Sequence, residues 1–557
     1  MAWDSLPLEI YQHIFRNLSF FERKPLSLVC RRWNQAVFSR LLSPRLCIFL
    51  SEAMWLMDDR ICLVDAEVIE ASERDYPVVY VKWRSDSSAE KVASINRMLT
   101  ELDKKCFLEE LIVTAPLEAL YDFFQAHQQL LTKIKRLQVY TAKEDTEPIA
   151  DRCTLKMDQL EVLHWDELTS GHARNDDPIF VINAPKLHSA VVEYNYYNSW
   201  PNSCMELSQY ASLKKFHVHL YPEMRTGFFE KRSDALEEIT LENNEKLSWD
   251  WDRIFSNMPN LKSINMTSVD NDILCAIIRH CPQLRTFICR NVDLTGQILS
   301  VAGIFPQLQH FELKFAQIHS TRPLYLPNLK YFQLLHIENY NEQPFILDTP
   351  MLHTLRLCAL KESDVIVAPK TSLKYLWLEI GNTGIPEHYF QPFPCLRKLD
   401  IFDYSWRSDL VRLMPYVAKI TEFNLSVDLG QGDPVLIAIS KYCNNLSAMN
   451  LCGIGNLGLE LSFPVFAQIF SKLNLKSLSV TRLTVTGNSF RLHILPGLKN
   501  LEFIEVKIMD VAFGADVFSS DESDRLVYDE HNDGYSYWST DHYYTEENII
   551  ARVWETL

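Results

Sequence analysis

The 557-residue sequence lacks the long apolar runs that would cross a membrane or direct a chain to secretion. Its densest apolar runs, 46–50 and 435–439, are far shorter than the roughly 18 residues that a membrane-spanning helix needs. Asp4 and Glu9 flank a short apolar stretch that no basic segment precedes, so no signal peptide is expected. We therefore expect a soluble protein of the cytoplasm, the nucleus or both.

Cysteine patterns typical of disulfide-rich or metal-binding proteins are also missing. The thirteen cysteines are odd in number, spread from Cys30 to Cys452, and form no CxxC pair. His217 and His219 share one face of an expected strand, but no third ligand lies near them in sequence, which favours surface histidines over a metal site. We expect reduced thiols in packed positions, and no metal or other cofactor.

Positive charge is scarce, and the net charge of −17 argues against nucleic-acid binding. Residues 516–557 hold eleven acidic residues against Arg525 and Arg552, and so contribute −9 of that charge. This C-terminal tail, assigned to 513–557, is also rich in Tyr and Trp, which a purely solvating tail would lack. Docking of the tail onto the rest of the protein or its partner, and a disordered tail, are alternatives of similar weight.

The first forty residues contain two apolar stripes at helical spacing. One runs from Tyr11 to Leu18 at i, i+3, i+4 and i+7, and Pro7 suits the first turn of that helix, where its missing N–H costs nothing. The second runs from Val29 to Leu41. Such short helices cannot bury all of this apolar surface alone, which predicts a docking module. A helical cap for the segment that follows is the alternative.

These residues resemble the F-box motif in order and spacing: Leu6-Pro-x-Glu-Ile10, Ile14-Phe15, Leu18 and Leu28-Val-Cys-Arg-x-Trp33. The resemblance implies a small helical domain over 1–43 that docks on a Skp-type adaptor and, through it, on cullin and RING subunits. The sequence departs from the family at Arg23-Lys24-Pro25, where an Asp-Leu pair usually leads the second helix, so that helix is expected to be shorter or shifted. The resemblance assigns adaptor binding to Leu6, Pro7, Ile10, Ile14, Phe15, Leu18, Leu28, Val29 and Trp33.

From residue 108 onward one pattern returns seventeen times, at intervals of 21 to 29 residues. An apolar residue is followed by two variable ones and then by apolar, variable, apolar. Alternate residues of a strand point to opposite faces, so the fourth and sixth positions share one face. A single short strand cannot bury that face, which predicts that the copies stack into a parallel sheet. The copies start at Leu108, Ile134, Leu160, Leu187, Leu213, Leu236, Leu261, Leu284, Leu308, Leu329, Leu352, Leu373, Leu396, Ile420, Leu446, Leu475 and Leu501.

The pattern resembles the leucine-rich repeat, as in LEEITLENN at 236–244 and LKYLWLEIG at 373–381. The resemblance implies an α/β solenoid over 108–512, a horseshoe with its parallel sheet on the concave side. The family's closing Asn occurs at Asn244 but is mostly replaced elsewhere. A linker with a degenerate first repeat is assigned to 44–107, with a strand at 76–83 and a helix at 86–104. A sheet-rich globular domain with chance periodicity is the alternative.

Segments between the copies vary in length and composition. The copies between 308 and 396 leave little room for outer helices, whereas helices are expected at 272–280 and 464–473. Seven copies carry a proline two residues before their first Leu, which is expected to end the preceding segment and favour extension. These prolines are Pro185, Pro259, Pro282, Pro306, Pro327, Pro350 and Pro394.

Positions three, five and seven of each copy are predicted to face away from the core. In the short central copies they gather aromatic side chains, an Arg and charges of both signs, a composition typical of interaction hot spots. We expect a protein substrate to bind there; solvated strand residues, or residues that the tail covers, are the alternative. The candidates are Tyr331, Gln333, Arg356, Tyr375, Trp377, Glu379, Lys398, Asp400 and Phe402.

Patterns typical of enzymes are incomplete in this sequence. Gly453, Gly455 and Gly458 match GxGxxG, but the next expected strand ends at Arg482 without the acidic residue that a dinucleotide site needs. We therefore expect no catalytic activity. The two resemblances together imply the substrate-recognition subunit of an SCF-type ubiquitin ligase, which holds its target near the conjugating enzyme. A non-proteolytic interaction scaffold is the second interpretation.

Overall fold

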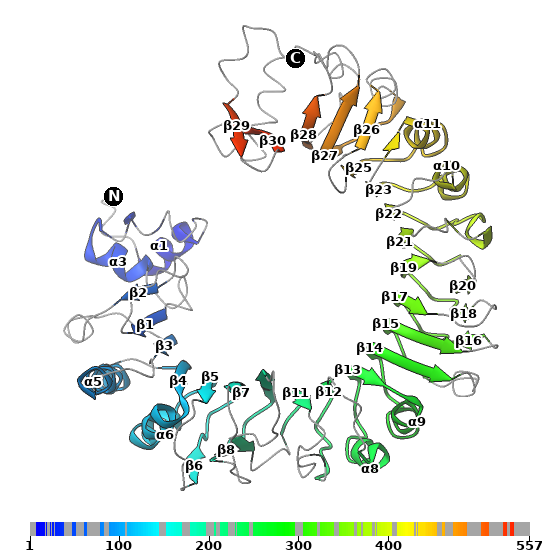
Figure 1. Cartoon of the computed structure of the whole chain (residues 1–557). Helices are drawn as coiled ribbons and strands as arrows, with labels where there is room; N and C mark the ends of the chain where they lie inside the picture. The colour runs from blue at the N-terminus through cyan, green and yellow to red at the C-terminus, as the bar shows by residue number, and fades with distance from the viewer. Residues whose placement is uncertain are drawn as a thin grey trace. The chain divides into compact units, whose positions relative to one another are not determined.

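Figure 1 shows a computed structural model of the chain. The chain divides into two compact units, residues 1–265 and 266–557. No helix in the described part of the chain is long and apolar enough to cross a membrane. The structure describes residues 7–16, 18, 23, 25–26, 28–37, 47–51, 61–63, 78–82, 89–105, 108–143, 152–169, 179–195, 205–207, 212–220, 229, 231–243, 249–295, 305–319, 323–338, 345–360, 365–368, 371–380, 385, 387–403, 409–427, 430–431, 433–453, 459–462, 472–486, 503–511, 527–531 and 535–539.

The first unit begins with short helices and continues as a parallel sheet. Helices α1 (Leu8–Phe15) and α3 (Arg31–Val37) precede strands that lie in the order β2-β1-β3-β4-β5-β7-β9-β11-β12. The strands are β1 (Cys47–Ser51), β2 (Ile61–Leu63), β3 (Val78–Lys82), β4 (Glu110–Pro116), β5 (Arg136–Lys143), β7 (Val162–Thr169), β9 (Ser189–Asn195), β11 (Lys215–Leu220) and β12 (Glu238–Asn243).

Further elements of the first unit lie between these strands in the sequence. The helices are α5 (Ala89–Lys105), α6 (Leu117–Ala126), α7 (Gln128–Leu131) and α8 (Trp251–Ser256), and a small parallel sheet holds β6 (Cys153–Lys156), β8 (Phe180–Asn183) and β10 (Met205–Leu207). The strand predicted at 76–83 and the helix predicted at 86–104 are confirmed by β3 and α5. The sheet starts earlier than predicted, at β1 and β2, which the sequence patterns did not indicate.

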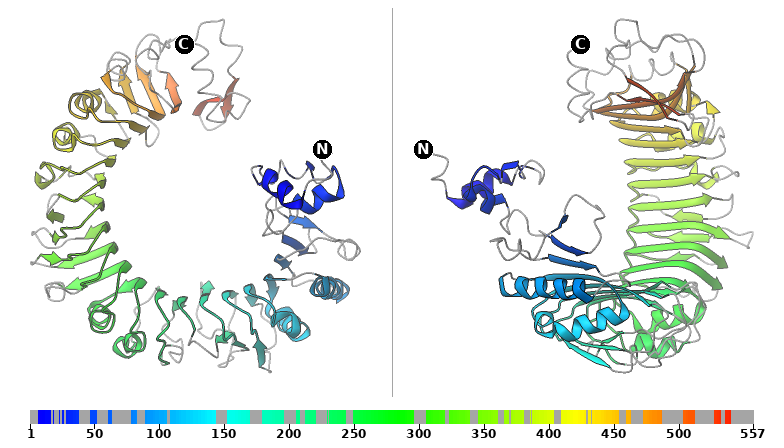
Figure 2. Two further views of the ribbon diagram at one scale, coloured as in Figure 1. Left: turned by 180° about the vertical axis from the view of Figure 1, so that it is seen from behind. Right: turned by 60° about the vertical axis from the view of Figure 1, so that its left-hand side comes forward.

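The second unit is a parallel sheet in the order β14-β15-β17-β19-β21-β22-β23-β25-β27-β28, whose strands lie side by side like rungs (Figure 2). Strand β13 (Ser263–Val269) contains the boundary between the units. The sheet consists of β14 (Thr286–Thr295), β15 (His310–His319), β17 (Tyr331–Glu338), β19 (Thr354–Leu360), β21 (Tyr375–Ile380), β22 (Lys398–Asp403), β23 (Glu422–Val427), β25 (Ala448–Gly453), β27 (Ser477–Thr486) and β28 (Phe503–Val511).

The other elements of the second unit connect these strands. They are α9 (Asn271–His280), η3 (Glu387–Tyr389), α10 (Asp409–Leu413), η4 (Met414–Val417), α11 (Asp433–Tyr442), β24 (Gly430–Gln431) and β26 (Leu459–Ser462). Strands β24 and β26 also pair with each other, and β26 pairs with β27, so both belong to the sheet. The expected helix at 272–280 is confirmed by α9, whose N-cap residue Asp270 accepts the N–H groups of Asp272 and Ile273 at 3.1 Å each. The helix expected at 464–473 lies almost wholly outside the described residues. In the tail, β29 (Val527–His531) and β30 (Tyr535–Ser539) pair antiparallel.

The recurring apolar pattern sets where the strands begin. After each of the seventeen predicted starting residues, a strand begins two residues later, as at Tyr375 after Leu373. Leu376 and Leu378, at positions four and six, are fully buried, and Leu399 and Ile401 lie beside them in register and are equally buried. The prediction of parallel strands with positions four and six on one buried face is confirmed.

The prolines before the copies have a different role from the one expected. Each is the second residue of a β-turn, which is closed by a hydrogen bond of 3.1 to 3.4 Å from the N–H of the first Leu to the carbonyl before the proline. Proline suits this position because its φ is already fixed near the value that the turn requires. The copy that begins at Ile420 makes the same turn without proline, with Ile420 N donating to the carbonyl of Val417 at 3.1 Å. The prolines therefore stiffen a turn rather than impose extension.

In the short copies the outer segments form strands. Strands β16 (Leu324–Tyr325), β18 (Phe345–Asp348) and β20 (Val365–Ala368) build a second, three-stranded parallel sheet. The prediction that the copies between 308 and 396 leave little room for outer helices agrees with their described residues, where the outer segments hold these strands and one short 3-10 helix, η3. That the outer segments pair with one another as strands was not predicted, because a segment of two to four residues carries no readable periodicity.

Truncating a core residue of the second unit is expected to destabilise it strongly. Leu378→Ala opens a cavity beside Leu357 and Ile401, so we expect a loss of about 2–5 kcal/mol in the free energy of unfolding of this unit. Lys374→Ala, at an exposed position before the same strand, should change it by less than about 0.5 kcal/mol. Native-state hydrogen exchange of the β21 and β22 amides measures both, and equal exchange rates in the two variants would refute the assigned core.

Candidate functional site

One face of the long parallel sheet of the second unit carries all nine residues predicted as substrate contacts. They come from β17, β19, β21 and β22, and the register of these strands places Gln333, Arg356, Trp377 and Asp400 in one row across the sheet. The structure therefore brings the predicted residues together on one side. This central face is defined as Tyr331, Gln333, Arg356, Tyr375, Trp377, Glu379, Lys398, Asp400 and Phe402.

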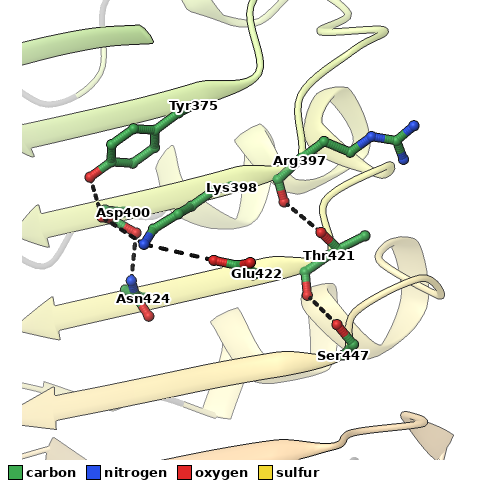
Figure 3. A network of polar contacts seen from close by, with 8 residues as sticks. All are labelled: Tyr375, Arg397, Lys398, Asp400, Thr421, Glu422, Asn424 and Ser447. Atoms are coloured by element: carbon green, nitrogen blue, oxygen red, sulfur yellow. Dashed lines mark hydrogen bonds and ion pairs between the residues drawn. The ribbon is translucent and has the colours of Figure 1, made fainter.

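Asp400 is the centre of a hydrogen-bond network on this face (Figure 3). Its carboxylate accepts the hydroxyl of Tyr375 at 2.5 Å and the amide Nδ2 of Asn424 at 2.6 Å. Lys398 Nζ lies 4.0 Å from Asp400 and 3.7 Å from Glu422, so it bridges two carboxylates. Burial, together with the Asp400 carboxylate that Tyr375 donates to, raises the pKa of Tyr375, so the phenol keeps its proton and remains a donor. The network fixes Asp400 as a buried, paired carboxylate.

Hydroxyl groups at the start of neighbouring strands add lateral bonds near this network (Figure 3). Thr421 Oγ1 donates to the carbonyl of Arg397 at 3.2 Å, and Ser447 Oγ donates to the carbonyl of Thr421 at 3.0 Å. These bonds join β22 to β23 and β23 to β25. The rigid position of the strands in turn holds the side chains of the central face in place.

Aromatic rings occupy the rest of the central face. The rings of Trp377 and Phe402 are 5.5 Å apart, and the guanidinium of Arg356 lies 5.0 Å from the centre of the Trp377 ring. Tyr331 donates its hydroxyl to Gln333 Oε1 at 2.6 Å and stacks on His310 at 4.2 Å. The face thus combines a flat apolar surface with one cation held on an aromatic ring, an arrangement that suits protein recognition.

Two of the predicted contact residues need correction. Gln333 is 6% exposed and Asp400 is 8% exposed, so both are buried beneath the face. They accept hydrogen bonds from Tyr331 and from Tyr375 and Asn424, and these bonds hold the neighbouring side chains in position. The other seven are partly buried rather than solvated. The sequence analysis did not select His310 and Glu312, at positions three and five of the copy that begins at Leu308, or Asn424, at position five of the copy that begins at Ile420.

The other candidate groups show no built site in the described part of the chain. His164 lies 3.7 Å from Glu193 and His217 lies 3.8 Å from Glu242, while burial lowers the pKa of His219. No group of three or more His, Cys, Asp or Glu among the described residues is arranged to hold a metal ion. The glycine-rich stretch after Gly453 lies outside the described residues.

Aromatic packing builds the core of the N-terminal helices. Tyr11 and Phe15 on α1, with Ala36 and Val37 on α3, are at most 3% exposed. The ring of Trp33 lies 5.2 Å from Phe15 and 6.0 Å from Tyr11, and each such pair contributes roughly 0.5–1.5 kcal/mol. Pro7 precedes the first helical residue of α1, and its carbonyl accepts the N–H of Ile10 at 3.1 Å, one residue earlier than the first-turn position predicted.

Among the described residues of these helices and their connection, four large apolar side chains are exposed. Leu28 is 85% exposed and Val29 is 61% exposed, and both lie in the turn before α3. Ile10 and Ile14 on α1 are 44% and 38% exposed. The turn is fixed by backbone bonds from Leu28 N to the carbonyl of Pro25 and from Val29 N to the carbonyl of Leu26, at 3.1 and 3.2 Å. A formed turn that presents large apolar side chains to solvent is typical of a docking surface.

Comparison with known families gives a match over these helices. Residues 3–49 match the family model described as F-box-like. The chain therefore carries an F-box-like domain. Domains of this family generally bind Skp-type adaptors. No curated protein matches the chain.

The family match covers residues 3–49, and the domain predicted from the sequence covers residues 1–43. The match ends at Phe49, inside β1, whose backbone pairs with β3. Within the domain, Phe15 is 3% exposed and belongs to the core, Trp33 and Leu18 are half-buried and pack against that core, and Pro7 is exposed; adaptor binding by these residues stays a prediction. Leu6 lies outside the described residues. The docking surface is therefore defined here as Ile10, Ile14, Leu28 and Val29.

Proposed function

We propose that this protein is the substrate-recognition subunit of an SCF-type ubiquitin ligase. Its F-box-like domain binds a Skp-type adaptor, which links it to cullin and RING subunits, and its central face binds the protein to be ubiquitinated. The observation that carries the proposal is the exposure of Leu28 and Val29 on a formed turn of the F-box-like domain. Water contact with such side chains is unfavourable by about 1.5–3 kcal/mol each, which an adaptor would relieve.

In this function the chain supplies proximity and no reacting group. Holding a target lysine near a charged conjugating enzyme raises its effective concentration, so transfer needs no catalytic residue from the receptor. Burial raises the pKa of Cys281 and of Cys443 to about 12, so these two thiols stay protonated and are poor nucleophiles.

We assign the recurring strands to leucine-rich repeats. Support comes from the strand that begins two residues after each starting residue, from the parallel register, and from the turn that precedes most copies. In a repeat array each copy contacts mainly its neighbours, so a long polar face can be built without a large globular core.

Affinity purification of the full chain from cells with a blocked proteasome tests the function. We expect adaptor, cullin and RING subunits to be retained together with a small set of further proteins, whose abundance rises when the chain is depleted. Absence of adaptor and cullin from the purified material would contradict the proposal. Retention of both with no change in the abundance of any retained protein would instead identify a non-proteolytic scaffold.

A further inference from the structure

Arg356 on β19 carries a charge that no carboxylate of the described residues neutralises. Its Nε is buried and has no hydrogen-bond partner, and the guanidinium is held over the ring of Trp377 at 5.0 Å. Leaving a buried donor unpaired costs roughly 1–3 kcal/mol, and more when the group is charged. The cation–π contact offsets only about 0.5–2 kcal/mol of this cost. The terminal N–H groups of the guanidinium, unlike the buried Nε, donate to none of the described residues and can meet a further partner.

The acids of the same face have partners of their own. Glu379 accepts the thiol of Cys358 at 2.7 Å, Glu312 lies 2.6 Å from His310, and Asp400 is held by Tyr375 and Asn424. Each acid therefore interacts with a neighbour other than Arg356. Of the two cations of the central face, Lys398 lies 3.7 Å from Glu422, whereas Arg356 has no carboxylate partner among the described residues, which suits it to one anionic group of a partner.

We propose that Arg356 is the anion-binding residue of the central face and takes a carboxylate or phosphate group from a peptide segment of the bound protein. A guanidinium presents two parallel N–H donors that match the oxygens of either group. Trp377 fixes the plane of that fork before binding, and Phe402, 5.5 Å from Trp377, extends an apolar wall for the flanking side chain of the peptide. The inference deepens the proposed function and rests on it, since it names the chemistry of the substrate segment.

Degenerate peptide libraries that differ only in one fixed central residue test the site. Phosphoserine, glutamate and glutamine libraries are passed over the immobilised full chain, and the retained fraction of each is measured. We expect the phosphoserine or the glutamate library to be retained roughly tenfold more than the glutamine library, because only an anion pairs with the fork. Preference for phosphoserine over glutamate assigns a phosphate, and equal retention of these two assigns a carboxylate.

Variants at two cations make the result specific. Arg356→Gln should abolish the preference, and Arg356→Lys should reduce it to a few-fold, because an ammonium lacks the planar fork. Lys374→Gln removes an exposed charge outside the central face and should leave the preference unchanged. Equal retention of the three libraries, retention of none, or an unchanged preference in Arg356→Gln overturns the proposal.

Failure of this inference can be told apart from failure of the proposed function. If Arg356→Gln still retains adaptor and the same cellular proteins as the wild type, the anion site is refuted and the receptor function stands. If the wild-type chain retains neither adaptor nor cellular proteins, the receptor function itself is refuted, whatever the libraries show.

Discussion

Replacing Leu28 and Val29 with Asp is expected to abolish adaptor binding and to leave the F-box-like domain folded. Both side chains are largely exposed and contribute little to the domain's own core, so their loss costs little stability. In a complex, each would bury apolar surface worth about 1.5–3 kcal/mol, and a carboxylate at the same place adds a desolvation cost. We expect the affinity for a Skp-type adaptor to fall at least roughly 100-fold.

Calorimetric titration with purified adaptor measures this change. Gln35→Glu serves as the matched control, because it adds a negative charge at an exposed position of α3 outside the docking surface. Circular dichroism of both variants verifies that the helices persist. An affinity within threefold of wild type for the double variant, or an equal loss in the control, would refute the role of the docking surface.

Replacing Tyr375, Trp377 and Phe402 with Ala should abolish the capture of cellular proteins while adaptor binding persists. Aromatic side chains at the centre of an interface often contribute about 2 kcal/mol or more each, so the combined loss exceeds what most interfaces tolerate. Their rings also form the wall beside Arg356, which the substitutions remove. Comparison of the proteins retained by wild type and variant, by quantitative mass spectrometry, measures the effect.

Stability must be separated from recognition in this experiment. Tyr375→Ala also removes a donor from the buried Asp400, a loss of about 1–3 kcal/mol in the free energy of unfolding. Trp377→Ala combined with Phe402→Ala leaves that bond intact and should still abolish capture. Tyr325→Ala, an exposed aromatic residue on the outer strand β16, is the control that should change nothing. Capture by the triple variant at wild-type level would exclude the central face.

The sequence predicted the second unit's strands well because their spacing reflects a physical constraint. Leu376 and Leu378 must both be buried, and two-residue periodicity fixes the side of the sheet on which they lie. The same spacing could not show that Gln333 and Asp400 are covered, because coverage depends on side chains of adjoining strands such as Tyr375 and Asn424. The two-residue periodicity of a strand shows on which face of the sheet a side chain lies. The side chains of adjoining strands determine how much of it is exposed to solvent.

The F-box-like domain illustrates a related limit. An apolar stripe on α1 is compatible with an internal core and with a docking surface, and both readings apply to different members of the stripe. Phe15 is enclosed by Trp33, whereas Ile14 is left exposed. Helical spacing includes both residues in one broad apolar stripe, although consecutive side chains point about 100° apart around the helix axis. The spacing of apolar residues along one helix therefore does not show which of them pack inside the domain and which are left for another protein.

The most direct test of the account is to mix the purified full chain with a purified Skp-type adaptor and measure the mass of the product. Size-exclusion chromatography with light scattering should give one species whose mass is the 64.9 kDa of the chain plus one adaptor. The Leu28→Asp, Val29→Asp variant should give two separate species. Elution of the wild-type chain at 64.9 kDa, apart from the adaptor at micromolar concentrations of both, would contradict the claim that its exposed apolar turn is a docking surface for that protein.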